Sequence, residues 1–358
     1  MIVSIARLRA SWPFILPVLA WVLIGVSGVA TLPWIVLTLV LLGTVLAAVH
    51  HAELVAHHVG EPLGTLLLAV AVTVIETALI VSIMLSGGDE AARLPRDTVF
   101  AAIMIILNGI VGACLLVGGL QHREQTYGLH GVSAALATLA ALAILTLVLP
   151  NYTSTSPGPW YSDAQVAFVA FVSLALYGTF VLMQTVRHRA DFVEEPAPDE
   201  NHAVAPSRLA LATSTVVLLI ALGAVVLLAK RLAPSIEALV ASSGAPRAVV
   251  GLIIAAVVLM PEGLAALRAA KANRLQTSLN LALGSALAAI ALTLPTVAAL
   301  SLAWGLKLEL GLDPKATVLL VLSLFVAQLS LATGRTTLLQ GAIHLVIFGV
   351  YVFLTLVP

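Results

Sequence analysis

Two glutamates lie inside long apolar stretches of the sequence, where ionisable side chains are rare. Glu76 is the one ionisable residue of "LLLAVAVTVIETALIVSIM", and Glu262 lies in "VVLMPEGL". A charge at the centre of a membrane helix costs about 2.5–3.5 kcal/mol on insertion scales, so such residues usually have a function. Carboxylate oxygens can hold either protons or a metal ion. We therefore predict that both glutamates bind a cation and protons alternately; a protonated glutamate that joins two helices is the alternative.

Neutral oxygen donors accompany the two glutamates. Thr73 and Thr77 lie within one helical turn of Glu76, and the helices that follow each glutamate carry asparagine or serine. A hard cation prefers such oxygen ligands to thiolate or imidazole. An intramembrane asparagine can equally be a packing residue between helices. The predicted cation- and proton-binding residues are Glu76, Glu262, Thr73, Ser285, Asn108 and Asn280, with Glu76 and Glu262 as the metal ligands.

Pro261 directly precedes Glu262, and Gly263 follows it. Proline removes a backbone donor and frees a carbonyl about one turn earlier in the helix. Broken helices at membrane depth occur where they line a cavity, and their freed carbonyls often bind cations. The pattern predicts a helix break at Pro261 and Gly263.

Histidines form a second titratable group, in "HHAELVAHH". Imidazole titrates near neutral pH, so this cluster fits a zinc site or a pH sensor as well as the polar end of a helix. His344 lies alone in the last apolar stretch and fits a packed histidine better than a ligand. The cluster consists of His50, His51, His57 and His58.

The composition defines the solvent in which these residues act. Of 358 residues, 61% are hydrophobic and 9% are charged, and the mean hydropathy is +1.10. A membrane-spanning helix needs about 20 apolar residues, and we count about eleven such stretches. They are too long and too continuously apolar for transmembrane strands, so we predict an all-α integral membrane protein. The stretches are 13–30, 33–52, 61–86, 97–120, 130–150, 163–186, 207–229, 246–268, 275–300, 315–332 and 336–357.

The two halves of the sequence repeat each other. "ELVAHHVGEP" begins at Glu53 and "EALVASSGAP" begins at Glu237, and both share the order Glu, six residues, Gly, one residue, Pro. Each motif precedes a stretch with a deep glutamate, and then a stretch with Asn, three residues, Gly. The second glutamate-bearing stretch is the fifth after the first, with four spans between them, so the repeats have opposite topology, as in many transporters. Glu53 and Glu237 are candidates for the path by which the ion approaches.

A polar, proline-rich segment divides the two repeats. We predict an N-terminal helix at 1–32, a five-helix repeat at 33–186, a linker at 187–206 and a second five-helix repeat at 207–358. Ten Lys and Arg residues fall on the side of the N-terminus and linker, against seven on the other side, which favours a cytoplasmic location for both. The expected location is the cell inner (plasma) membrane.

These residues resemble the calcium/cation antiporter superfamily, and most closely its bacterial ChaA-type calcium or sodium–potassium/proton antiporters. The resemblance is strongest over "AELVAHHVGEPLGTLLLAVAVTVIETALIVSI" and "VVGLIIAAVVLMPEGLAALRAAKANRLQTSLNLALGSALAAIALTLP". The calcium/proton branch commonly has Gly-Asn-Ala-x-Glu at each glutamate, where this chain has "VTVIE" and "LMPE". The resemblance implies that Ser285 faces the site. It also aligns Thr333 and Gln340, in "TGRTTLLQG", with acidic positions of the family.

We therefore expect a secondary antiporter that exports Ca²⁺, or Na⁺ and K⁺, in exchange for H⁺. A cation channel and a cation/cation exchanger without proton coupling are the alternatives. The sequence has no nucleotide-binding glycine loop, nucleophile elbow or HExxH motif, so we expect neither an enzyme nor a resident cofactor. The expected partners are the lipid bilayer, inorganic cations and protons, and no nucleic acid; the sequence leaves the oligomeric state open.

Overall fold

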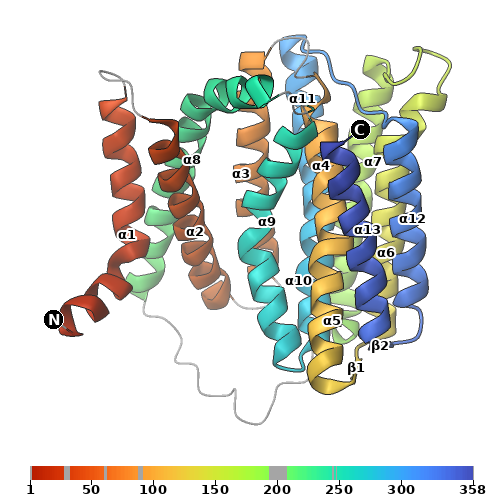
Figure 1. Ribbon diagram of the computed structural model, residues 1–358, viewed down its shortest axis with the longest axis horizontal. Helices are drawn as coiled ribbons and strands as arrows, with labels where there is room; N and C mark the ends of the chain where they lie inside the picture. Colours follow the sequence, from red (N-terminus) through yellow and green to blue (C-terminus); the bar gives the residue numbers. More distant parts are fainter. Residues whose placement is uncertain are drawn as a thin grey trace. The chain divides into compact units, whose positions relative to one another are not determined.

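The computed structural model describes residues 2–27, 33–59, 63–87, 92–192, 208–243, 246 and 248–357. It is helical apart from one short two-stranded ribbon, and it divides into two compact units, which are described separately. Figure 1 shows the elements with their labels. The predicted linker, 187–206, lies largely outside the described residues, as does the "GEP" turn at 60–62.

The small unit consists of three N-terminal helices and α8 up to Leu239. The helices α1 and α2 pack against each other, and α2 also packs against α3. Fully buried alanines such as Ala47, Ala48 and Ala224 allow helices to approach closely, as is common in membranes. Its helices are α1 (Ile2–Val26), α2 (Trp34–Val59), α3 (Leu63–Gly87) and α8 (Arg208–Ser243).

The large unit contains the remaining elements. Its spans include single π-helical turns, which often occur at functional sites. The elements are α4 (Leu94–Met104), η2 (Ile105–Ile110), α5 (Val111–His122), β1 (Glu124–Thr126), α6 (Leu129–Ala143), η3 (Ile144–Val148), η4 (Leu149–Tyr152), α7 (Asp163–Leu182), η5 (Met183–Arg187), η6 (Arg189–Asp191), α9 (Ala248–Lys271), α10 (Leu275–Ala288), η7 (Ala289–Thr293), α11 (Leu294–Trp304), α12 (Pro314–Ser330), β2 (Arg335–Thr337) and α13 (Leu338–Leu356).

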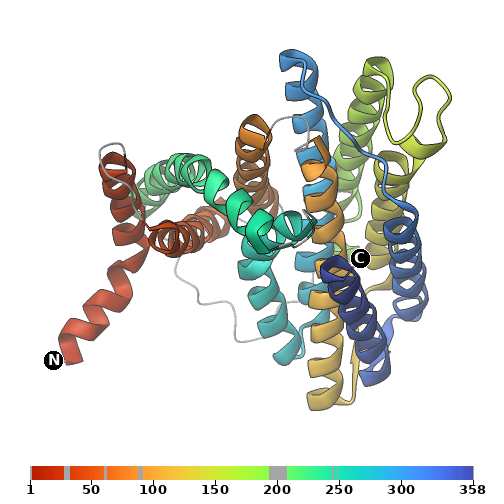
Figure 2. The ribbon, with the colours of Figure 1, turned by 45° about the horizontal axis from the view of Figure 1, so that its top comes forward.

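Glycines allow α13 to pack directly on the backbone of α5, and the two helices lie side by side in Figures 1 and 2. A Cβ atom at Gly341 would lie 2.3 Å from the backbone nitrogen of Leu116, and one at Gly119 would lie 2.6 Å from that of Leu338. Neither position can hold a larger residue without moving a helix. The strands β1 and β2 pair in antiparallel fashion next to this contact, a ribbon that the sequence analysis did not predict.

The described residues contain eight helices that are long and apolar enough to span a membrane, and three shorter apolar helices at Ser11–Val26, Val70–Leu85 and Pro314–Ser330. Each of the eleven predicted stretches overlaps one of these segments. The predicted fold class, an all-α membrane protein with about eleven spans, is confirmed.

Two loop contacts show the inverted relation of the repeats. The segment between α11 and α12 packs on the start of α4, where the Glu309 amide donates to the Ala92 carbonyl at 3.0 Å. The segment between α5 and α6 packs on the start of α10, where the Gly128 amide donates to the Gln276 side chain at 2.6 Å. The span formed by α4, η2 and α5 therefore begins where the span formed by α10, η7 and α11 ends, and ends where that span begins. These two equivalent spans of the repeats run in opposite directions.

Candidate cation site

The first glutamate lies on the buried face of α3, in the small unit. Glu76 is 3% exposed, and the neighbouring Thr73 and Thr77 are 7% and 8% exposed. Val70 and Val74, on another face of the helix, are exposed. The carboxyl and both threonine side chains are therefore removed from the surface together. Cation binding by Glu76 and Thr73 stays a prediction.

The second glutamate lies on α9, in the large unit. Glu262 is 8% exposed and is flanked along the helix by buried Val258, Leu259 and Ala266. This helix packs against α4, α5 and α10. Glu262 thus lies in more apolar surroundings on its own helix than Glu76 does, since no threonine or serine occupies the adjacent turns.

The predicted helix break at Pro261 and Gly263 is wrong, because α9 continues through both residues from Ala248 to Lys271. Proline removes only one backbone hydrogen bond, and the packing of α9 against three neighbouring helices supports its remaining turns. A Cβ atom at Gly263 would lie 3.1 Å from the Ile110 Cδ1 atom. Gly263 therefore serves the close packing of α9 on η2.

Glu76 and Glu262 belong to different compact units. The structure places each carboxyl within its own unit, and the alternate binding of a cation and protons by both glutamates stays a prediction.

Asn108 lies on the π-helical turn η2 and is completely buried. Its Oδ1 atom is 3.1 Å from His344 Nδ1, and its Nδ2 atom donates to Ser323 Oγ at 2.8 Å. His344, also completely buried, has its Nε2 atom 2.8 Å from Ser330 Oγ. The structure therefore joins Asn108 to a polar network of α12 and α13. The sequence analysis predicted His344 as a packed histidine and missed this partnership.

The equivalent residues of the second repeat have different surroundings. Asn280, on α10, accepts from Gln276 Nε2 at 3.0 Å and donates to the Phe192 carbonyl. Ser285 lies on the same helix and is partly buried. Gln340, from the C-terminal segment, caps α13, since its Oε1 atom accepts from the Thr337 amide at 2.9 Å.

The histidine cluster on α2 is partly covered by α1. His51 is fully buried, its Nε2 atom is 3.3 Å from the Pro13 carbonyl oxygen, and its ring lies 4.9 Å from the Phe14 ring. Glu53 is exposed. The side chains of His57 and Glu237 lie outside the described set. Among the residues that the structure describes, no three His, Cys, Asp or Glu side chains form a metal-binding group.

A buried ion-pair network lies at the start of α4, and the sequence analysis did not identify it. Arg96 Nη1 is 2.7 Å from Glu309 Oε1, and Arg93 Nε is 2.9 Å from Glu309 Oε2. Arg96 also contacts Asp97 Oδ1 at 2.9 Å and donates to the Gly311 carbonyl at 2.7 Å. These contacts hold the segment between α11 and α12. In the sequence, the network is visible only as four charged residues at the borders of apolar stretches.

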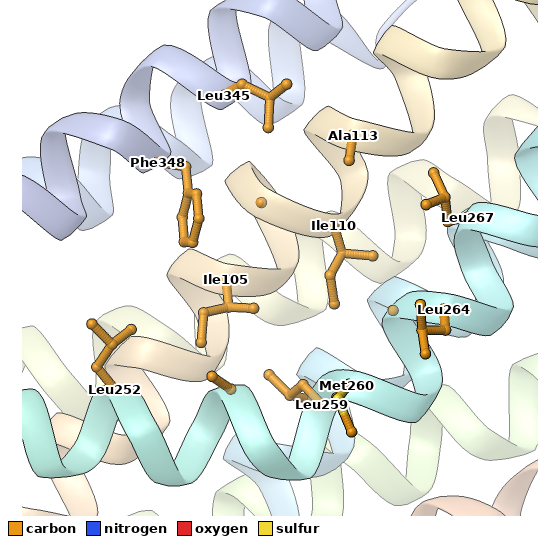
Figure 3. Close-up of a pocket in the computed structure, with 13 residues that line it drawn as sticks. Ile105, Ile110, Ala113, Leu252, Leu259, Met260, Leu264, Leu267, Leu345 and Phe348 are labelled. Carbon is orange, nitrogen blue, oxygen red and sulfur yellow. The ribbon is translucent and has the colours of Figure 1, made fainter.

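A cavity of about 380 Å³ lies between α9, α13 and the α4–η2–α5 span. Figure 3 shows apolar side chains around it, including Ile105, Met260, Leu264 and Phe348. None of its lining side chains carries an oxygen atom. A hard cation requires oxygen ligands, so this cavity is not the cation site.

Inverted helical repeats, each with a glutamate buried within a membrane-spanning helix, define the architecture of a secondary membrane transporter. The chain belongs to the sodium/calcium exchanger protein family, whose sequence profile matches residues 29–186 and 213–357, and it is therefore a cation antiporter and not an enzyme.

Individual relatives agree with this assignment. The chain is 39% identical to the sodium-potassium/proton antiporter ChaA of Escherichia coli (strain K12), over 94% of each chain. It is 25% identical to a Ca²⁺/H⁺ antiporter of Aphanothece halophytica, over 82% of this chain and 81% of that protein. The solved structure of native YfkE matches with a TM-score of 0.74 at 16% identity, over 97% of this chain and 100% of the other. The structural match shows the fold.

Proposed function

We propose that this protein is a cation/proton antiporter of the cell inner (plasma) membrane, and that Glu76 and Glu262 hold the cation or protons alternately. The observation that carries the proposal is one buried glutamate at an equivalent position in each repeat, 3% and 8% exposed. Charged groups at membrane depth are costly, and a bound cation or proton offsets that cost. Release of the cation therefore favours binding of protons, and release of protons favours binding of the cation.

Thr73 supplies a hydroxyl beside Glu76, and Ser285, Asn108 and Asn280 supply neutral oxygens from the large unit in this proposal. Two carboxylates match the charge of one Ca²⁺ or of two monovalent cations. The relatives support both choices: one is named as a sodium-potassium/proton antiporter and the other as a Ca²⁺/H⁺ antiporter. The transported cation is accordingly Ca²⁺, Na⁺ or K⁺, in exchange for H⁺.

The test is proton flux in proteoliposomes that contain the purified protein and a trapped pH dye. Each cation is added in turn from outside, and the initial rate of pH change is recorded. An antiporter moves protons out of the vesicle lumen as the cation enters, so the dye reports alkalinisation. We expect this response for at least one of Ca²⁺, Na⁺ and K⁺.

The matched variants are Glu76→Gln and Glu262→Gln, which keep the side-chain shape but remove the exchangeable charge. Both should lose cation-driven proton flux. Glu124→Gln is the control, because that carboxyl is 49% exposed and pairs with Arg335 at the surface. Full flux in either single variant of the buried pair would show that its carboxyl is not required.

The two alternatives give different results in the same vesicles. A channel would conduct the cation without moving a fixed number of protons, and the pH response would then disappear when the membrane potential is clamped. A cation/cation exchanger would move labelled cation only against another cation, with no pH response.

The charges of the large unit support a cytoplasmic location for its β1–β2 end. Five basic residues gather there, against four at the opposite end, where Arg93 and Arg96 are paired with Glu309 and Asp97 and the other two are Lys307 and Lys315. Cytoplasmic loops carry an excess of basic residues. The basic residues of the β1–β2 end are Arg123, Arg268, Lys271, Arg274 and Arg335.

A further inference from the structure

The polar network around Asn108 lies in the interior of the large unit, where it joins η2 to α12 and α13, two consecutive spans that are far from η2 in the sequence. Asn108, Ser323 and His344 are each 0% exposed, and Ser330 is 8% exposed. Asn108 belongs to η2, the two serines to α12 and His344 to α13. Interactions between neutral polar groups in such an interior fix side-chain orientation, because an unpaired polar group there is costly.

The hydrogen bonds define the direction of each group. Ser323 Oγ donates to the Leu319 carbonyl at 2.7 Å, so it accepts from the Asn108 amide nitrogen. The second hydrogen of that amide is directed to Met104 Sδ, at 3.8 Å. The Asn108 oxygen therefore faces His344, whose Nδ1–H donates to it, and Ser330 donates to the remaining ring nitrogen. This arrangement is consistent with a neutral histidine.

This arrangement uses both donors of the Asn108 amide but only one lone pair of its oxygen. An amide oxygen has two lone pairs, so a second partner can bind without displacing His344. The network cannot relay protons along its length, since an amide does not exchange its hydrogens in the way that a hydroxyl or imidazole does. What it can do is hold one oxygen in a fixed direction on a π-helical turn.

We propose that His344 is a positioning residue for Asn108, and that it orients the Asn108 oxygen as a ligand of the transported cation. The inference rests on the proposed function, in which Asn108 is one of the neutral oxygen ligands. A fixed ligand loses less conformational freedom when the cation binds, so the contact contributes to cation affinity more than to the transport rate.

Two near-isosteric variants separate the two hydrogen bonds of the ring. His344→Asn places an amide near the Nδ1 position and retains the donor to Asn108. His344→Gln places an amide near the Nε2 position and retains the contact with Ser330 but loses the donor to Asn108. Both variants remove the ring, so they change the packing volume in the same direction.

The measurement is proton flux in proteoliposomes as a function of cation concentration, with whichever of Ca²⁺, Na⁺ and K⁺ the wild type transports. We expect His344→Gln to raise the half-saturating concentration about 3- to 10-fold, the factor that corresponds to one neutral hydrogen bond, with a maximal rate close to wild type. His344→Asn and the control Ser330→Ala should stay within about twofold of the wild type in both quantities.

Equal effects of His344→Asn and His344→Gln would overturn the inference, because they would indicate a role in packing alone. An unchanged half-saturating concentration in His344→Gln would also overturn it. If His344→Gln does not fold, Ser323→Ala serves instead, because it removes the hydrogen-bond acceptor of the Asn108 amide nitrogen and should produce the same rise in half-saturating concentration. An unchanged half-saturating concentration in Ser323→Ala would then count against the inference. A wild type without cation-driven flux would refute the proposed function, whereas the preceding results leave that function intact.

Discussion

Removing the charge of Glu309 should destabilise the protein far more than removing the charge of Arg93, although the two residues contact each other. The Glu309 side chain is 7% exposed and that of Arg96 is 10% exposed, whereas that of Arg93 is 63% exposed. Breaking a buried ion pair by removing one partner typically costs about 3–5 kcal/mol, and an exposed pair contributes about 0–1 kcal/mol. The burial of each side chain therefore decides how much stability is lost when its charge is removed.

For Glu309→Gln we expect the lower end of that range, about 3 kcal/mol, because Asp97 Oδ1 remains 2.9 Å from Arg96 Nε and compensates part of its charge. With roughly 2 °C of melting temperature per kcal/mol for a chain of this size, the loss is about 6 °C. Arg93→Gln should lower the melting temperature by at most about 2 °C.

The assay is thermal unfolding of the detergent-solubilised protein at fixed heating rate, followed by tryptophan fluorescence and by loss of the monodisperse peak in size-exclusion chromatography. Equal shifts for Glu309→Gln and Arg93→Gln would refute the reasoning, since burial would then not set the cost. A shift below 2 °C for Glu309→Gln would show that the segment between α11 and α12 is held by other contacts.

Two further predictions concern pH and orientation. Cation affinity should rise with pH, because fewer protons then compete for the buried carboxyls. The same dependence of affinity on pH should persist when the histidine cluster is replaced by glutamine. A flat pH profile with intact transport in that variant would assign the pH dependence to the histidines. A cysteine at Thr333 should react with a membrane-impermeant thiol reagent only from the cytoplasmic side, and a cysteine at Lys307 only from the outside. Native Cys114, which is 1% exposed, provides the unreactive background. The reverse labelling pattern would show that the proposed topology is inverted. The replaced cluster is His50, His51, His57 and His58.

The sequence alone was sufficient to predict the membrane spans, and it also singled out the two glutamates as the proposed site. Transfer of a helix into a bilayer depends on the composition of about 20 consecutive residues, which is a local property. For the same reason, an isolated Glu76 or Glu262 is easy to recognise within an apolar stretch. The motifs beginning at Glu53 and Glu237 identify the two repeats, and the number of spans between them predicts that the repeats have opposite orientations in the membrane. Neither inference required knowledge of which helices touch.

Only the tertiary structure decided the surroundings of these residues, because those depend on contacts between distant segments. Asn108 meets His344 across 236 positions, and Arg96 meets Glu309 across 213. Pro261 predicts a break when α9 is considered alone, yet α9 stays continuous because three helices pack against it. Hydropathy does not contain this information: in a bilayer, all apolar helix faces are equally well solvated, so close packing and buried polar contacts select the partners.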